Sequence, residues 1–213
     1  MEGDELRFFD PYGETERSWN RVPHWQQAGA TYFVTFRLAD SVPSVLVEEL
    51  EERKREWLDK NPKPWSDEKE IEYHRKFSGL VESWLDEGRG SCLLRSPENA
   101  IELKRVFLKC DGERYHLVSF VVMPNHVHVL FVLNREFELA GEVKAWKGIS
   151  ARRINRNEKR GGPLWQKSYF DRLVRDLDHF QNCIRYIRRN PGKAGLSESQ
   201  YLLYESELAR MVL

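Results

Sequence analysis

The chain has 213 residues, of which 40% are hydrophobic and 32% charged, a composition that excludes wholesale disorder and predicts one well-buried core. Its 34 basic and 34 acidic residues cancel, but residues 144–193 hold 14 basic and 4 acidic residues, which predicts a basic face for an anionic partner. No apolar run approaches the roughly 18 residues of a membrane helix, and the acidic start MEGDELRFFD has no apolar secretory signal, so we expect no membrane partner. Cys92, Cys110 and Cys183 are odd in number and too widely spaced for a disulfide framework or a zinc site, which favours the reducing cytoplasm.

The first part of the chain is predicted to hold an arm, a strand and a charged helical section. Residues 1–29 are polar with scattered aromatic residues and are expected to form an irregular arm. Residues 30–38 alternate apolar side chains at period two, which predicts a strand. Residues 46–88 are highly charged, and the prolines within 61–64 predict a break between two helices. We interpret 46–88 as a solvated helical hairpin with one packed face.

The remaining segments alternate between strand and helix patterns, and such an order predicts an α+β sandwich. The last helix is expected to be capped by Asp178 and Gln181 and to stop near Pro191. The predicted strands cover 91–94, 115–123, 126–133 and 165–175, and the predicted helices cover 97–108, 139–154 and 178–190.

The segment VVMPNHVHVLFVL carries the first candidate site. His126 and His128 are two residues apart on a predicted strand, so both side chains project from the same face. Two imidazoles held this close could chelate a divalent metal. The alternative is a pair of hydrogen-bonded histidines at a sheet edge, which a lone His-x-His pattern favours.

The last predicted helix carries the second candidate site. Tyr186 and Asn190 are four residues apart and therefore lie on nearly the same helix face. Five arginines lie nearby in sequence, and cations favour ionisation of a phenol, so Tyr186 is a candidate nucleophile. The alternatives are a tyrosine at the margin of the core and a solvated row of arginines. The five arginines are Arg172, Arg175, Arg185, Arg188 and Arg189.

The combination resembles the single-tyrosine HUH transposases, the IS200-like group, and within them the REP-associated tyrosine transposases of bacteria. The resemblance spans roughly residues 20–196. The early strand YFVTFRL fits the family's first strand, and residues 46–88 exceed its minimal core. Four separated blocks occur in the family's order: MPNHVHVL at 123–130, SARRIN at 150–155, PLWQKSYFDRLVRD at 163–176 and YIRRNPGKAGL at 186–196.

This resemblance implies a ferredoxin-like antiparallel sheet flanked by helices. It places one catalytic domain at 30–196, with 46–88 as a helical insertion and 197–213 as a C-terminal tail. It makes Tyr186 the nucleophile of a metal-dependent enzyme that cleaves single-stranded DNA beside hairpins, as REP elements form, through a 5′-phosphotyrosine. The implied ligands of a divalent cation, Mg²⁺ or Mn²⁺, are His126, His128 and Asn190.

Basic residues of the 144–193 segment are expected to follow the DNA backbone. On the helix predicted at 139–154 and just beyond it they are Lys144, Lys147, Arg152, Arg153 and Arg156, and the five arginines near Tyr186 complete the set. The aromatic residues Trp165, Tyr169 and Phe170 could stack on bases, although core packing is the favoured alternative.

Two other functions stay open at the level of the sequence. One is a non-catalytic module that binds DNA or RNA hairpins, and the other is metal-dependent hydrolysis by water with a structural Tyr186. The presence of both histidines together with Tyr186 and Asn190 favours the enzyme. No protein partner is implied, and the family resemblance leaves a monomer or a homodimer open.

Overall fold

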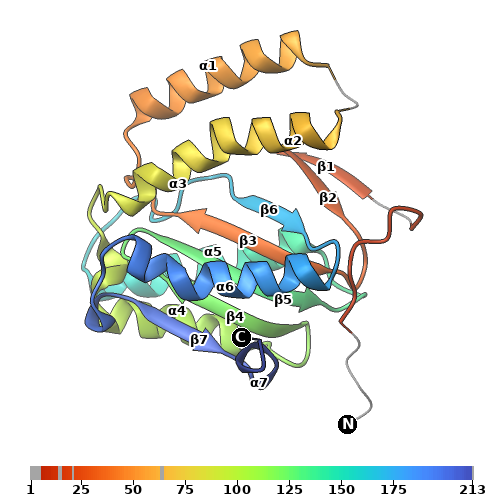
Figure 1. Ribbon diagram of the computed structural model, residues 1–213. Helices are drawn as coiled ribbons and strands as arrows, with labels where there is room; N and C mark the ends of the chain where they lie inside the picture. The colour runs from red at the N-terminus through yellow and green to blue at the C-terminus, as the bar shows by residue number, and fades with distance from the viewer. Residues whose placement is uncertain (1–5, 14–15, 21, 63–64, 213) are drawn as a thin grey trace.

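The computed structural model describes residues 6–13, 16–20, 22–62 and 65–212 (Figure 1). Its centre is an antiparallel sheet of five strands in the order β6-β3-β5-β4-β7. The strands are β3 (Thr31–Arg37), β4 (Tyr115–Val122), β5 (His126–Leu133), β6 (Phe170–Leu173) and β7 (Leu202–Glu205).

The chain order explains the sheet order. Helix α4 (Pro97–Leu108) connects β3 to β4, and helix α5 (Leu139–Asn157) connects β5 to β6. The resulting β-α-β-β-α-β unit places its fourth strand beside its first, then its third and its second, which is the ferredoxin-like arrangement. The predicted α+β fold with a ferredoxin-like antiparallel sheet is confirmed.

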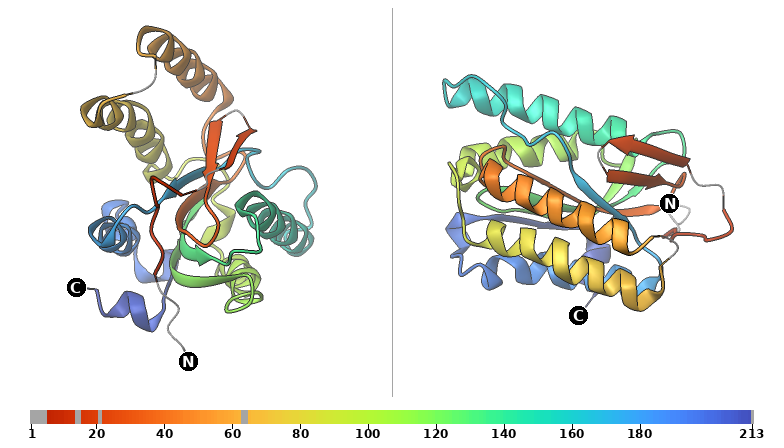
Figure 2. Two further views of the ribbon diagram at one scale, coloured as in Figure 1. Left: turned by 90° about the vertical axis from the view of Figure 1, so that its right-hand side faces the viewer. Right: turned by 90° about the horizontal axis from the view of Figure 1, so that it is seen from above.

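The two faces of the sheet have different partners because side chains alternate along each strand. On β5, Val127, Val129 and Phe131 belong to the core beneath α4 and α5. The alternate residue Leu130 belongs to a second core, which includes Phe180 of helix α6 (Leu177–Lys193). Figure 2 shows α6 on one side of the sheet and α4 with α5 on the other.

The core beneath α4 and α5 is anchored by Trp146. Its ring is 2% exposed and meets the edges or faces of Phe107, Tyr115 and Phe131 at centroid distances of 5.1, 5.1 and 5.0 Å. The indole Nε1 donates to Tyr115 Oη at 2.9 Å, so its polar atom is also satisfied. This packing holds the central strands rigidly from the side opposite α6.

The segment 46–88 forms a helical arm, in agreement with the sequence. The arm contains α1 (Ser44–Lys60), α2 (Asp67–Tyr73), a π-helical turn (His74–Ser78) and α3 (Gly79–Asp86), and α1 lies farthest from the sheet (Figure 1). A small core of its own forms around the buried side chains of Leu50, Trp57 and Phe77. No helix in the described ranges is long and apolar enough to cross a membrane.

Two expectations for the N-terminal half are wrong. Part of the N-terminal segment 1–29, which the sequence predicts to be irregular, forms a two-stranded antiparallel sheet of β1 (Glu16–Asn20) and β2 (Val22–Gln26). Its sequence is polar and β2 contains Pro23, and both features weigh against a strand. The strand expected at 91–94 is absent, because Leu93–Arg95 form a 3₁₀ turn after Cys92, whose φ of 49° is left-handed.

The C-terminal half also differs in two places. Of the strand expected at 165–175, Phe170–Leu173 pair in continuous register with β3, and Trp165 forms an isolated bridge with Leu38. Between them, Lys147 Nζ binds the carbonyl oxygens of Gln166 and Lys167 at 2.7 and 2.8 Å. Residues 202–205, expected within a tail, form β7 and pair with β4, and the short helix α7 (Glu207–Arg210) follows.

Helix α6 begins and ends at other residues than the sequence predicts. Asp176 caps it, since its Oδ1 accepts from the backbone N–H of His179 at 2.7 Å. The helix continues through Pro191 to Lys193 because only one N–H donor is lost there, while Ala194 N donates to Asn190 O at 3.1 Å.

The cap provides a direct comparison of two neighbouring aspartates. We expect Asp176→Ala to lower the free energy of unfolding by about 1 kcal/mol, since the His179 N–H loses its acceptor. Asp178→Ala should cost less, roughly 0.3–1 kcal/mol, because Asp178 only faces the helix dipole from the first turn. Urea unfolding of both variants measures the difference, and an equal or larger cost at Asp178 would contradict the assignment.

Candidate active site

The two histidines of β5 lie side by side and point at one another. Both are 1% exposed, and their Nε2 atoms are 3.1 Å apart. His126 Nδ1 lies 2.8 Å from Asn125 Oδ1, and His128 Nδ1 lies 2.7 Å from Thr35 Oγ1 on β3. Because each Nδ1 has its own partner, both Nε2 atoms are left to face a common point.

Burial keeps both imidazoles neutral. It lowers the pKa of His126 to about 3, with a further contribution from the positive charge of Lys193. The pKa of His128 is also lowered well below its ordinary value, by burial first, then by His126 and Lys193. Neutral imidazoles are the form that binds a metal ion.

Helix α6 brings Tyr186 and Asn190 to the same point. Asn190 is 2% exposed, and its Nδ2 lies 3.3 Å from His128 Nε2. The ring of Tyr186 meets that of His128 edge-on with centroids 5.1 Å apart, and Phe33 of β3 packs against both rings. The four residues singled out from two separate motifs are therefore gathered by β5 and α6.

The donor atoms at this point suit a divalent cation. Asn190 Oδ1 is buried and finds no hydrogen-bond partner within the described residues, as expected of an atom that needs a further ligand. Nowhere in the ranges that the structure describes do three or more His, Cys, Asp or Glu side chains gather for a metal, so a cation here would need the amide oxygen. Two imidazoles suit Mn²⁺ better than Mg²⁺, which prefers oxygen.

The electrostatic environment of Tyr186 differs from the expectation that arginines would favour its ionisation. Burial raises the pKa of Tyr186 first, and the carboxylates of Glu82 and Asp86 raise it further. The phenol donates a hydrogen bond to Glu82, while Asn190 donates one to the phenol. Both acidic residues belong to α3, so the negative charges near Tyr186 come from the helical segment 46–88 and not from residues close to Tyr186 in sequence.

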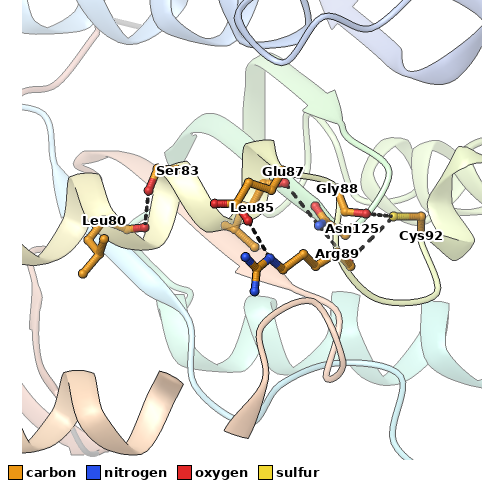
Figure 3. A network of polar contacts seen from close by, with 8 residues as sticks. All are labelled: Leu80, Ser83, Leu85, Glu87, Gly88, Arg89, Cys92 and Asn125. Atoms are coloured by element: carbon orange, nitrogen blue, oxygen red, sulfur yellow. Dashed lines mark hydrogen bonds and ion pairs between the residues drawn. The ribbon is translucent and has the colours of Figure 1, made fainter. Parts of the chain in front are cut away.

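Helix α3 is fixed to the strand that carries the histidines. Asn125, in the turn between β4 and β5, is 1% exposed and donates through Nδ2 to Leu85 O at 3.2 Å and to Arg89 O at 3.1 Å (Figure 3). Its Oδ1 faces His126, so one amide connects the end of α3 to an imidazole. Asp86 adds an ion pair of 2.8 Å with Lys193 of α6.

Comparison with known proteins identifies the surrounding segment. Residues 95–190 match the model of the family described as transposase IS200 like. The resemblance inferred from the motifs is confirmed. His126, His128, Tyr186 and Asn190 all lie inside the match, whereas the helical segment 46–88 precedes it.

One relative is similar in sequence to part of this chain, and one solved structure is similar in fold. The chain is 26% identical over 99 residues to a Haemophilus influenzae protein named "Putative REP-associated tyrosine transposase", a match that spans 42% of this chain and 56% of the relative. A solved REP-associated tyrosine transposase bound to a REP hairpin shares the fold, with a TM-score of 0.52 and 15% identity over 84% of this chain and 77% of that one.

A basic pocket opens beside Tyr186. It has a volume of about 350 Å³ and follows one face of α6, lined by Asn182, Arg185, Tyr186, Arg189, Asn190 and Lys193. Lys193 was not selected from the sequence. Arg188 lies on the other flank of the helix, where it binds Glu205 at 2.8 Å and donates to Ala209 O at 3.2 Å and Val212 O at 2.9 Å.

The basic residues of α5 lie across the sheet from α6, whereas Arg172 of β6 lies close enough to Glu82 and to Cys183 of α6 to oppose the rise in pKa that burial causes in each. The five on α5 belong to the helix that packs on the face opposite α6, so the segment does not form one basic face. Lys147 holds the 166–168 backbone, and burial lowers its pKa to about 8. Arg153 pairs with Glu102 at 3.1 Å. The indole of Trp165 is 6% exposed and donates to Ser150, so its predicted core packing is confirmed.

Sequence patterns missed five residues that shape this site. Asn125 stands next to His126 in the MPNHVHVL block, and this adjacency was a usable signal. Thr35 shares the face of β3 that opposes His128, but it becomes visible only once β3 and β5 are paired. Glu82, Asp86 and Lys193 gave no signal, because their contacts depend on how the insertion packs.

Proposed function

We propose that this chain is a metal-dependent, transposase-like enzyme that cleaves and rejoins single-stranded DNA beside hairpins of the REP type. The observation that carries the proposal is the meeting of two buried imidazoles, an unpartnered amide oxygen and a phenol at one point beside a basic pocket. A fold shared with a transposase bound to a REP hairpin supports the choice of DNA.

Each residue of the site has a proposed role. Tyr186 is the nucleophile, and its oxygen replaces the 3′ oxygen on the scissile phosphorus, which leaves a 5′-phosphotyrosine and a free 3′-hydroxyl. His126, His128 and Asn190 would hold Mn²⁺ or Mg²⁺, which supplies Lewis-acid polarisation of the phosphate. Thr35 and Asn125 orient the imidazoles by binding their Nδ1 atoms.

The pocket along α6 is proposed to bind the DNA backbone. Arg185, Arg189 and Lys193 present three cations beside Tyr186, and such cations attract phosphates without reading the sequence. The covalent bond to Tyr186 retains the energy of the phosphodiester, so that the 3′-hydroxyl can reverse the step and rejoin strands.

The direct test is capture of the covalent intermediate. We expect labelled single-stranded DNA that carries a REP-like hairpin to form an SDS-resistant adduct with the protein in the presence of Mn²⁺, and a chelator to prevent it. Binding without an adduct for any hairpin tested would favour the non-catalytic binding module. Cleavage without a protein-linked strand would favour hydrolysis by water.

The location of basic residues on α6 and on α5, on opposite faces of the sheet, gives a second test. We expect Arg189→Ala to weaken hairpin binding and to reduce the slope of log affinity against log salt concentration by about 1, as loss of one phosphate contact does. Arg152→Ala removes an equal charge from the exposed side of α5, across the sheet, and should change the slope little. Fluorescence anisotropy measures both slopes. A larger effect at Arg152 would indicate that the DNA binds to the α5 face.

A further inference from the structure

The helical insertion reaches the proposed nucleophile through one carboxylate. Glu82 lies on α3 and accepts a hydrogen bond from the Tyr186 phenol. The two residues are far apart in sequence, and Glu82 lies outside the segment that matches the transposase family. The contact therefore joins the matched segment to the helical segment that precedes it.

The position of Glu82 is fixed by two contacts at the end of α3. Leu85, one turn later, is 3% exposed, and its carbonyl accepts from Asn125 Nδ2 at 3.2 Å. Asp86 is bound to Lys193 of α6 at 2.8 Å, one turn beyond Asn190. Because both β5 and α6 hold the end of α3, Glu82 is held in place beside the phenol.

The environment of Glu82 suits a group that takes up a proton. Burial raises the pKa of Glu82 first, and the nearby Asp86 also raises it. Lys193, the hydrogen bond from Tyr186 and Arg172 act in the opposite direction, so the charged form keeps partners. A carboxylate that is more basic than usual is a better acceptor for a phenolic proton.

Tyr186 needs such an acceptor. The phenol must lose its proton as its oxygen bonds to phosphorus, so a neighbouring group has to accept that proton. A neutral phenol is a weak nucleophile. Among the described residues that hydrogen-bond to the Tyr186 phenol, Glu82 is the carboxylate that can accept its proton.

We propose, on the basis of the function proposed above, that Glu82 is the general base and acid of strand cleavage and rejoining. As the bond from Tyr186 Oη to phosphorus forms and the bond from phosphorus to the 3′ oxygen breaks, the phenolic proton passes to the Glu82 carboxylate. The leaving 3′ oxygen takes a proton from water. In the reverse step the 3′-hydroxyl attacks phosphorus and loses its proton to water, and the departing Tyr186 oxygen regains its proton from Glu82.

The test compares Glu82→Gln with Glu56→Gln, which changes an exposed carboxylate on α1 of the same insertion. At saturating Mn²⁺ we expect Glu82→Gln to slow adduct formation by roughly 10²–10⁴-fold, the usual range for a lost general base. Wild type and Glu56→Gln should show a rate that rises with pH as Glu82 ionises. Glu82→Gln should lose this rise, while hairpin affinity and thermal unfolding stay unchanged.

The outcomes separate this inference from the function on which it rests. A wild-type protein that forms no adduct with any hairpin would remove the proposed function and the role of Glu82 together. An active wild type with an equally fast or faster Glu82→Gln variant would overturn the role of Glu82 alone. A slow variant that keeps the full pH-dependent rise would overturn it as well, because the rise would then belong to another group.

Discussion

Tyr186→Phe is expected to form no covalent adduct with hairpin DNA, while its affinity for the same DNA stays within about twofold of wild type. The phenyl ring can keep the edge contact with His128 and the packing on Phe33. Only the hydroxyl is lost, and with it the proposed bond to phosphorus. The hydrogen bond to Glu82 is lost too, which should cost about 1 kcal/mol of stability.

Denaturing electrophoresis with labelled DNA measures the adduct, and anisotropy measures binding. Tyr12→Phe is the matched control, because Tyr12 is 98% exposed and distant in sequence from every site residue. It should form adduct at the wild-type rate. An adduct that persists in Tyr186→Phe would show that another residue is the nucleophile, and peptide mass spectrometry would identify it.

Asn125→Ala is expected to have the largest effect on the architecture of the site. The variant loses one hydrogen bond to Leu85 at the end of α3, one to Arg89 just beyond it and one to His126, all made by a side chain that is 1% exposed. At about 1 kcal/mol for each bond, we expect unfolding to become easier by about 3 kcal/mol. Since the orientation of His126 is also lost, Mn²⁺ affinity should fall roughly 10–100-fold.

Urea unfolding and calorimetric titration with Mn²⁺ measure the two effects. Asn134→Ala provides the control, because Asn134 makes one exposed hydrogen bond to the Glu113 carbonyl, at 2.6 Å, away from the histidines. It should cost less than about 1 kcal/mol and leave Mn²⁺ affinity unchanged. Wild-type stability and metal affinity in Asn125→Ala would refute the proposed connection between α3 and the histidines.

Local periodicity was sufficient to predict the strand that carries the histidines. The alternation around Val127 and Val129 placed the imidazoles on the opposite face, and β5 has this arrangement. Helical spacing likewise put Tyr186 and Asn190 on one face of α6, where the pocket has them. Both predictions depend only on residues a few positions apart, for which backbone geometry fixes the relation.

Relations between distant segments could not be predicted in this way. The sign of the charge near Tyr186 depends on Glu82, which arrives from an insertion about a hundred positions earlier. The count of basic residues in 144–193 likewise cannot show that α5 and α6 cover opposite faces of the sheet. Short terminal elements were missed because four residues, as in β7, show too little alternation to stand out.

The pairing of β7 with β4 has a consequence for association between molecules. β4 pairs with β5 on one side and with β7 on the other, so its backbone groups are covered. If β7 detached, the N–H and C=O groups of Ser119–Val122 would face solvent, and these residues are fully buried and mostly apolar. An exposed edge of this kind pairs readily with a second chain. By holding Glu205, Arg188 helps to keep the short strand β7, rather than the longer apolar strand β4, at the edge of the sheet.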